Sequence, residues 1–263
     1  SIGADPMNDF SISFEYNMQN NTENDILQLP EKIAIEKGIQ IVICIDEFQQ
    51  ISDFEDSKTF QKKLRSVWQL QQHVSYCLFG SKKHLMNELF EKKNLPFYKF
   101  GDAIYLAKIE TKYWIEYICK RFENTGKHIS PELAEEICRL VDNHSSYVQQ
   151  LSWLLWIRTI NTATTEQLSY ALEDLLDQNN ILFQSETENL SAYQMNFLKA
   201  IVDGIHTKFS SKEVISKYNL GTSANIVRLK NALLQKELIE TNGKEIVLAD
   251  PVFGVWFKKE MLY

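Results

Sequence analysis

The sequence contains no apolar run long enough to cross a membrane and no recognisable export signal. Its longest apolar runs, such as 41–45 and 154–157, are far shorter than the roughly 20 residues that a membrane-spanning helix needs. Near the start, Asp5 and Asp9 stand where a signal peptide would have basic and then apolar residues. We therefore expect no membrane segment and a cytoplasmic protein.

Cysteine and histidine patterns that are typical of zinc sites are also missing. No two cysteines form a Cys-x-x-Cys pair, and the five histidines form neither a His-x-x-x-His nor a His-x-x-Glu-His arrangement. Each cysteine lies within an apolar stretch, which predicts buried free thiols rather than metal ligands. The four cysteines are Cys44, Cys77, Cys119 and Cys138.

An excess of positive charge is missing from the chain as a whole. The formal net charge of −7 argues against general affinity for nucleic acid. Residues 190–263, however, hold 10 Lys and Arg against 7 Asp and Glu, whereas residues 1–189 hold 18 against 28. This asymmetry predicts a separate C-terminal module.

The first part of the chain alternates strand and helix signals. Residues 11–16 alternate apolar and polar side chains like a one-sided strand, and 41–45 are continuously apolar, as in a parallel strand buried on both faces. A second buried strand is expected at 74–79 and a third at 103–107, with helices between them. Repeated strand-helix-strand units specify a parallel sheet with helices on both faces, so the predicted fold class is α/β.

Two further regions follow the α/β part. From about residue 109 the strand signal gives way to helical periodicity, which predicts an all-helical region. After residue 189, three helices precede two short strands joined by a tight turn at 241–244, which is the order of a winged helix. We therefore divide the chain into an α/β domain at 1–108, a helical domain at 109–188 and a winged-helix domain at 189–263.

Two consecutive carboxylates, Asp46 and Glu47, directly follow the strand expected at 41–45. In an open parallel sheet, ligands bind beyond the carboxyl ends of the strands. Asp46 can therefore face a bound Mg²⁺, usually through a coordinated water, while Glu47 can orient or deprotonate an attacking water. The alternative is a pair of surface carboxylates at the point where a strand leaves the core.

A small hydroxyl side chain follows the next strand, because 74–79 leads into Gly80 and Ser81. If the two strands are neighbours, Ser81 lies beside the two carboxylates and can hydrogen-bond a γ-phosphate or the attacking water. Ser81 can equally cap the helix expected at 82–90, and both roles can hold at once.

Four short segments stand out together. They are Asp46-Glu47-Phe48-Gln49, Leu78-Phe79-Gly80-Ser81 with Leu85-Met86, residues 143–151, and Asp250-Pro251-Val252-Phe253 with Trp256. In this order and spacing they resemble the archaeal-type ATPase family, a STAND-like branch of the AAA+ P-loop ATPases, from about residue 24 onward. The resemblance implies a switch that binds and hydrolyses ATP with Mg²⁺ and has a winged-helix output module. It makes Asp46 and Glu47 the Walker B carboxylates and Ser81 the sensor 1 residue.

The resemblance also implies a nucleotide contact in the helical domain, which is the lid of such ATPases. The helix that carries His144 and Tyr147 opens the lid and lies near the nucleotide in this family. The family usually has Gly-His-Pro before the tyrosine, whereas this sequence has Asn143-His144-Ser145. A histidine that simply begins a helix is therefore an equal alternative for His144.

The phosphate-binding loop of such ATPases is absent, because the sequence contains neither Gly-Lys-Ser nor Gly-Lys-Thr. This loop precedes the Walker B strand by on the order of a hundred residues. We therefore expect that truncation has removed this loop upstream. A natural pseudo-ATPase is the less favoured explanation. The chain is then a catalytically inactive fragment with no bound ATP or Mg²⁺, and its uncovered sheet strands favour self-association.

A non-enzymatic function through the winged helix is the alternative. Polar residues of its second helix can meet DNA phosphates or bases. Winged helices also act as protein-contact modules, so a DNA partner and a protein partner both stay open. The residues with a predicted DNA contact are Ser223, Asn225, Arg228 and Lys230.

Overall fold

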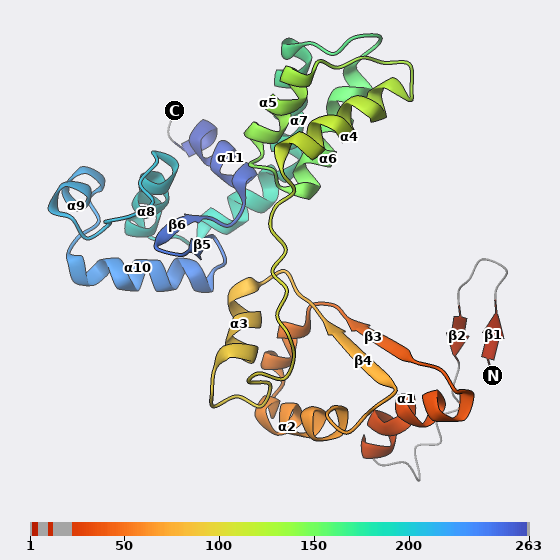
Figure 1. Cartoon of the computed structure of the whole chain (residues 1–263). Coiled ribbons are helices and arrows are strands. Elements are labelled where there is room, and N and C mark those ends of the chain that lie inside the picture. The colour runs from red at the N-terminus through yellow and green to blue at the C-terminus, as the bar shows by residue number, and fades with distance from the viewer. Residues whose placement is uncertain (1, 5–9, 13–22, 262–263) are drawn as a thin grey trace. The chain divides into compact units, whose positions relative to one another are not determined.

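The computed structural model of the protein describes residues 2–4, 10–12 and 23–261. The chain forms two compact units, 1–105 and 106–263 (Figure 1). The first unit holds the parallel sheet, and the second holds the helical region and the winged helix. Among the described residues, no helix has both the length and the apolar character that a bilayer crossing requires.

The first unit contains two small sheets and a set of helices. β1 (Ile2–Ala4) pairs antiparallel with β2 (Phe10–Ile12), and the remainder of the strand predicted at 11–16 lies outside the described residues. The elements that follow are α1 (Glu23–Lys37), β3 (Ile41–Ile45), the 3-10 helix η1 (Phe48–Asp53), α2 (Ser57–Trp68), β4 (Val74–Leu78) and α3 (Lys83–Glu91).

β3 and β4 form a parallel pair, which confirms the predicted α/β class. Their residues are in register from Ile41 opposite Val74 to Ile45 opposite Leu78. The core of this unit is aromatic, and the rings of Phe48 and Phe97 meet edge to face at 5.3 Å. Tyr76 of β4 stacks on Trp68 of α2 with ring centres 4.1 Å apart. One face of the sheet is thereby held against the helices.

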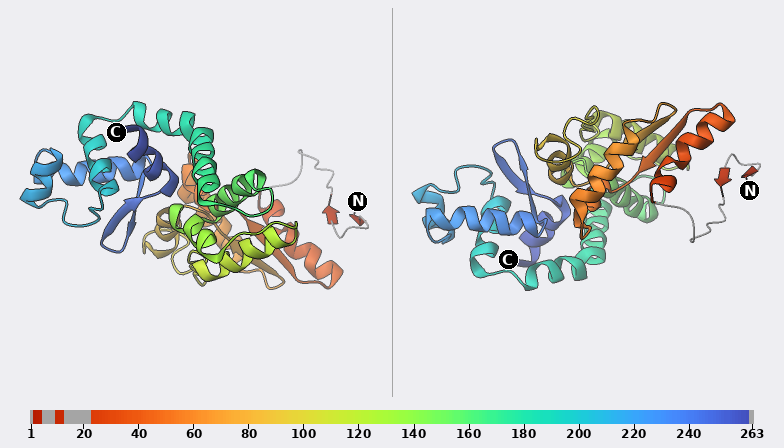
Figure 2. Two further views of the ribbon diagram at one scale, coloured as in Figure 1. Left: turned by 90° about the horizontal axis from the view of Figure 1, so that it is seen from above. Right: turned by 90° about the horizontal axis from the view of Figure 1, so that it is seen from below.

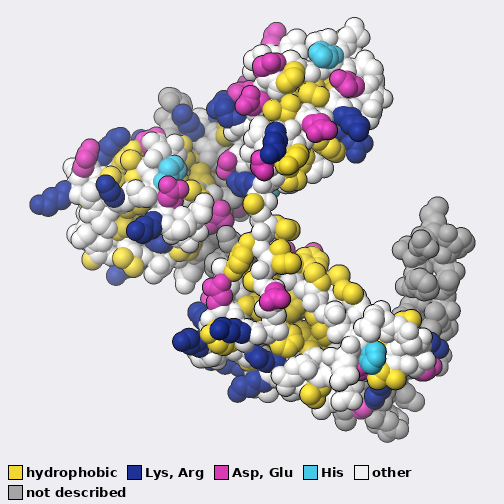
Figure 3. All heavy atoms as spheres, viewed as in Figure 1, with side chains coloured by type: hydrophobic (Ala, Val, Ile, Leu, Met, Phe, Trp, Pro, Cys, Tyr) yellow, Lys and Arg dark blue, Asp and Glu magenta, His cyan; other side chains and the backbone are white. Residues whose placement is uncertain are grey.

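The other face of this sheet is bare in the described part of the chain, which corrects the prediction of burial on both faces. Val42 is 65% exposed. Cys44 and Cys77, which are partners in the strand register, are exposed free thiols instead of buried ones. Figure 3 shows hydrophobic side chains exposed together over β3 and β4. An apolar run in the sequence indicates a strand, but it does not indicate that a second layer covers it.

The third strand predicted at 103–107 is wrong. Residues 101–110 have no regular secondary structure, and this segment crosses from the first unit to the second. Ile104 is 86% exposed and Leu106 is 93% exposed. An apolar run alone does not make a strand, because the described residues provide no neighbouring strand with which its backbone could pair.

The second unit is helical before its winged helix. Its first helices are α4 (Thr111–Glu123), α5 (Pro131–Leu140), α6 (Ser145–Arg158) and α7 (Thr165–Glu188). Ser130 caps α5 by accepting a hydrogen bond from the Leu133 N–H at 3.2 Å, and Pro131 occupies the first helical position. Thr164 and Gln167 form a reciprocal capping box at the start of α7. These local signals explain why each helix begins where it does.

The winged helix has the predicted order of three helices and two strands, which are α8 (Ala192–Val202), α9 (Lys212–Tyr218), α10 (Ser223–Gln235), β5 (Ile239–Asn242) and β6 (Glu245–Leu248). A further helix that was not predicted, α11 (Pro251–Met261), follows them. β5 and β6 form an antiparallel hairpin whose turn contains Gly243 at φ 61°, a left-handed conformation that glycine adopts without strain. Figure 2 shows this hairpin beside α10.

The helical region and the winged helix share one hydrophobic core. Phe183 of α7 lies 5.5 Å from the ring of Phe253 and 5.6 Å from that of Trp256, both on α11. The indole N–H of Trp256 also donates a hydrogen bond to Asn180 Oδ1 at 2.8 Å. The last helix of the chain therefore packs directly on α7.

Candidate functional site

The chemically most distinctive site of the first unit lies where β3 and β4 end. The strand ladder continues beyond both strands, since the Phe79 N–H donates to the Ile45 carbonyl at 3.1 Å and the Phe48 N–H donates to the Phe79 carbonyl at 3.0 Å. These bonds bring the residues that follow β3 next to those that follow β4. Glu47 and Ser81, which are 34 residues apart in the sequence, therefore lie side by side, as predicted for neighbouring strands.

The chain turns sharply at Glu47. This residue has φ 49° and ψ 39°, a left-handed backbone conformation that is uncommon for residues other than glycine. The Asp46 carboxylate accepts a hydrogen bond from the Glu47 N–H at 2.7 Å, which satisfies that N–H in the turn. The local sequence Asp46-Glu47 thus stabilises the turn that directs the Glu47 side chain toward the end of β4.

The Oε2 atom of Glu47 accepts two side-chain hydrogen bonds. One comes from the Gln49 side-chain amide, and the other comes from the Ser81 hydroxyl at 3.2 Å. The hydrogen bond from Gln49 is the main cause that holds the pKa of Glu47 below its usual value, and the bond from Ser81 is the next largest. The positive charge of Lys82 acts in the same direction. Glu47 is therefore a carboxylate at neutral pH and can accept a proton.

Ser81 does not cap the helix that follows it, which corrects one of the two predicted roles. α3 begins at Lys83, its cap position is Lys82, and no side chain there bonds the first turn. The Ser81 hydroxyl instead donates to Glu47. The register of β4 decides this outcome, because it places Ser81 at the sheet edge beside Glu47.

Sequence reasoning assigned no role to Gln49, although this residue belongs to the Asp46-Glu47-Phe48-Gln49 segment. Gln49 is 2% exposed and lies in η1. Its Nε2 donates to Glu47, while its Oε1 is buried and has no hydrogen-bond partner among the described residues. A polar residue directly after an apolar strand gives no sign that it will be buried, so the sequence contains only a weak signal for it.

In the second unit, Tyr147 bonds to the winged helix. Its hydroxyl donates to the Asp250 carboxylate. Burial of the ring is the main cause that raises the pKa of Tyr147, and the bond to Asp250 raises it further. His144 precedes α6 and its ring centre lies 4.8 Å from that of Tyr147. The Nδ1 atom of His144 is buried and has no partner among the described residues. A nucleotide contact of either residue stays a prediction.

The four predicted DNA-contact residues lie on α10 and differ in their availability. Ser223 and Arg228 are exposed, and Lys230 is half-buried. Asn225 donates its side-chain amide to the Leu220 carbonyl at 3.0 Å, so this amide already closes the turn before α10. Ser223 and Arg228 are therefore the side chains of the four that face solvent most fully.

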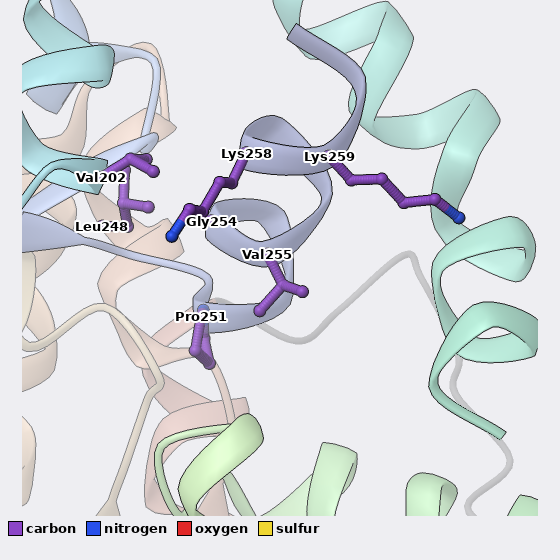
Figure 4. A pocket seen from close by; sticks show the side chains of 7 residues that line it. All are labelled: Val202, Leu248, Pro251, Gly254, Val255, Lys258 and Lys259. Atoms are coloured by element: carbon purple, nitrogen blue, oxygen red, sulfur yellow. The ribbon is translucent and has the colours of Figure 1, made fainter. Parts of the chain in front are cut away.

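A shallow groove of about 470 Å³ lies between β6, the end of α8 and α11 (Figure 4). Its lining is mostly apolar, and its two lysines, Lys258 and Lys259, point to different sides of α11 (Figure 4). Two cations that diverge do not form a common anion site, so this groove does not compete with the site at the ends of β3 and β4. The other lining residues are Val202, Leu248, Pro251, Gly254 and Val255.

Comparison with known proteins agrees with this architecture. A family model described as a probable winged helix domain matches residues 181–259. No curated protein matches the sequence. A Walker-type ATPase of Pyrococcus abyssi superposes with a TM-score of 0.69 at 16% identity, covering 93% of this chain and 72% of that one. The chain has an AAA+ ATPase-like fold with a C-terminal winged helix.

Two other solved structures align over most of the chain with lower scores. The ORC2 protein of Aeropyrum pernix, in complexes with ADPNP and ADP, has a TM-score of 0.47 and 13% identity, covering 95% of this chain and 73% of that one. The RuvB Holliday junction branch migration motor of Thermotoga maritima has a TM-score of 0.43 and 13% identity, covering 87% of this chain and 72% of that one.

The sequence predicts Mg²⁺ together with ATP, and Asp46, directly after β3, has the chemistry to hold that ion through water. Asp46 is exposed, and among the described residues it is bonded through Oδ1 to the Glu47 N–H. Mg²⁺ keeps several waters and usually takes one or two carboxylates from the protein. The described residues include no group of three or more potential metal ligands.

Proposed function

We propose that the first unit supplies the hydrolytic side of an ATP-driven switch. The observation that carries this proposal is the hydrogen bond of 3.2 Å from Ser81 to Glu47 at the carboxyl ends of two parallel strands. Ligands of open parallel sheets bind at this edge. The likeness of the fold to a Walker-type ATPase supports the same reading of the site.

Each side chain of the site has a separate task in this proposal. Asp46 holds the water shell of Mg²⁺, which would neutralise the charge of the phosphates when bound. Glu47 orients the attacking water and accepts its proton, and its lowered pKa keeps it ready as a base. Ser81 donates a hydrogen bond at the same edge, and its hydroxyl can turn from Glu47 to a phosphate oxygen.

The phosphates need backbone N–H groups and a lysine that these 263 residues do not provide in a Gly-Lys-Ser or Gly-Lys-Thr loop. The proposal therefore places that loop in a part of the protein outside this sequence. His144 is kept as a candidate nucleotide contact because its buried Nδ1 has no partner among the described residues. Tyr147 is a weaker candidate, since its hydroxyl is bonded to Asp250.

The test uses the protein as it occurs in its native source. Its intact mass is measured together with its binding of a fluorescent ATP analogue and its release of phosphate. We expect a form that contains a phosphate-binding loop to bind Mg·ATP, and Glu47→Gln in that form to bind equally well. Turnover by this variant should fall by about 10²- to 10⁴-fold, the usual contribution of a general base. Failure of every form to bind nucleotide would overturn the proposal.

The second candidate function is DNA binding through the winged helix. It is favoured by the exposure of Ser223 and Arg228 on α10 and by the excess of Lys and Arg in residues 190–263. Arg228→Gln should weaken binding to duplex DNA and lower its salt dependence by about one phosphate contact. Lys236→Gln, at the end of the same helix, is the control. Fluorescence anisotropy that shows no salt-dependent binding of the intact chain would leave a protein partner as the remaining candidate.

A further inference from the structure

We propose that Gln49 and Gly80 are positioning residues that together hold the Glu47 carboxylate in one orientation. Gln49 bonds Glu47 directly, and Gly80 leaves the space that lets Gln49 do so. Neither residue would touch the reacting atoms. The catalytic meaning of this arrangement rests on the proposed ATPase function, whereas the arrangement itself can be tested without it.

The first step of the argument is the burial of the Gln49 carboxamide. Gln49 is 2% exposed and its Oε1 has no donor. A buried carbonyl without a partner is unfavourable, so an apolar side chain would suit this position better if packing were its sole role. What the glutamine provides is its Nε2 donor, which reaches Glu47 Oε2.

The second step concerns Gly80, the residue between β4 and Ser81. A Cβ atom at this position would lie 1.9 Å from Gln49 Oε1 and 2.9 Å from its Cδ, far inside contact distance. The backbone of Gly80 is not in the left-handed region, so its conformation does not require glycine. A Cβ atom there would displace the end of the Gln49 side chain from its present orientation. The hydrogen that stands in place of a Cβ faces Oε1, and such a C–H···O contact offsets part of the missing hydrogen bond.

The third step is what this packing does to Glu47. Gln49 and the Ser81 hydroxyl both donate to Oε2 of Glu47. A glutamate at the surface otherwise samples several rotamers, and a misplacement of about 1 Å can cost a catalyst on the order of a hundredfold. Two donors on one oxygen, one of them buried, therefore hold the Glu47 carboxylate in one orientation.

The steric half of the proposal is tested by hydrogen exchange of the intact chain, read at the β3 and β4 amides. Gly80→Ala should speed exchange there by about tenfold or more, and by much less when Gln49→Ala has first made room, because contacting residues are not additive. Gly101→Ala is the control, since a Cβ there meets nothing within 4 Å. Equal effects of Gly80→Ala in both backgrounds would overturn the proposal.

The claim that Gln49 positions Glu47 needs a measurement that does not respond to a loss of packing. The Gln49 side-chain amide should give a slowly exchanging NMR signal that shifts in Glu47→Ala and stays in place in Lys58→Ala. An unshifted signal in Glu47→Ala would show that no bond joins the two residues and would overturn the proposal. This result does not depend on any ATPase activity.

In a form of the protein that hydrolyses ATP, Gln49→Leu should lower kcat by about tenfold to a hundredfold with unchanged nucleotide affinity. Gln61→Leu is the matched control, because Gln61 is also 2% exposed and its Oε1 is also unpaired. Equal kcat losses in the two variants would overturn the positioning role. If wild-type protein neither binds nor hydrolyses ATP, the proposed function fails, and the exchange and NMR experiments still decide the arrangement of Gln49, Gly80 and Glu47.

Discussion

The hydroxyl of Tyr147 donates a hydrogen bond to the carboxylate of Asp250, which lies 103 residues further along the chain. Asp250 also accepts bonds from the N–H groups of Val252 at 2.7 Å and Phe253 at 3.0 Å, and so caps α11. One carboxylate thus joins helix α6 to the last helix of the winged helix. Two sequence segments that the family resemblance had singled out separately are bonded to each other.

Tyr147→Phe is expected to weaken this junction. The change leaves a carboxylate oxygen of Asp250 without its donor in a half-buried place, which should lower the free energy of unfolding of the second unit by about 1–3 kcal/mol. Chemical denaturation of the intact chain measures this. Tyr170→Phe is the control, because the Tyr170 ring is 49% exposed and its hydroxyl has a long contact of 3.4 Å with Glu166. Equal losses in the two variants would show that the bond to Asp250 contributes nothing specific.

Glu186, beside the same junction, should contribute more to the stability of the second unit in mild acid than at neutral pH. Burial, and then the negative charge of Asp250, raises the pKa of Glu186 above its unfolded value. A raised carboxyl pKa favours the folded state below the unfolded pKa of about 4.3, and this contribution is lost as pH rises through the folded pKa. Glu186→Gln should therefore stabilise the unit at neutral pH and make the difference from wild type shrink toward pH 4.

Glu188→Gln, at an exposed position of the same helix, is the control for this pH dependence. The difference between variant and wild type is the quantity to compare, since Glu132 and Glu136 have lowered pKa values and act with the opposite sign. A difference that stays constant from pH 4 to pH 7 would contradict the role given to Glu186.

The bare face of the β3–β4 sheet predicts self-association of the chain. Val42 is 65% exposed there, and exposed apolar surface on a small sheet favours contact with a second copy. Val42→Lys should shift the mass measured by light scattering toward that of a monomer. Leu70→Lys removes a side chain that is 75% exposed after α2 and should leave the mass unchanged. A wild-type chain that is monomeric at high concentration would contradict this prediction.

The cysteines of the β3–β4 sheet should react with a thiol reagent faster than the buried cysteine of α5. Cys44 and Cys77 are exposed and should react with an aromatic disulfide reagent within the first phase in dilute native protein. Burial raises the pKa of the Cys138 thiol to about 11, so this residue should react after unfolding. Mass spectrometry of quenched samples identifies which residues carry the label. Early labelling of Cys138 would contradict the core that α5 forms.

Some helix boundaries of this protein can be predicted because local chemistry determines them. Ser130-Pro131 places the start of α5, and a left-handed Gly38 follows the end of α1. The apolar run 41–45 was enough to predict a strand, and Asp46-Glu47 after it was enough to predict a candidate site. In these cases the decisive interactions lie within a few residues along the chain.

Other features depended on partners far away in the sequence. Residues 103–107 form an apolar run like that of a strand, yet the described residues offer them no neighbour to pair with, and Cys44 stayed exposed because no described layer covers it. The role of Ser81 was open until the register of β4 placed it beside Glu47. The same register brings Gly80 against Gln49, and the packing of α11 on α7 brings Tyr147 to Asp250. The sequence by itself determined the elements whose signals are local, whereas the tertiary structure decided whether 103–107 could pair as a strand and which side chains meet, because such contacts depend on packing across the whole unit.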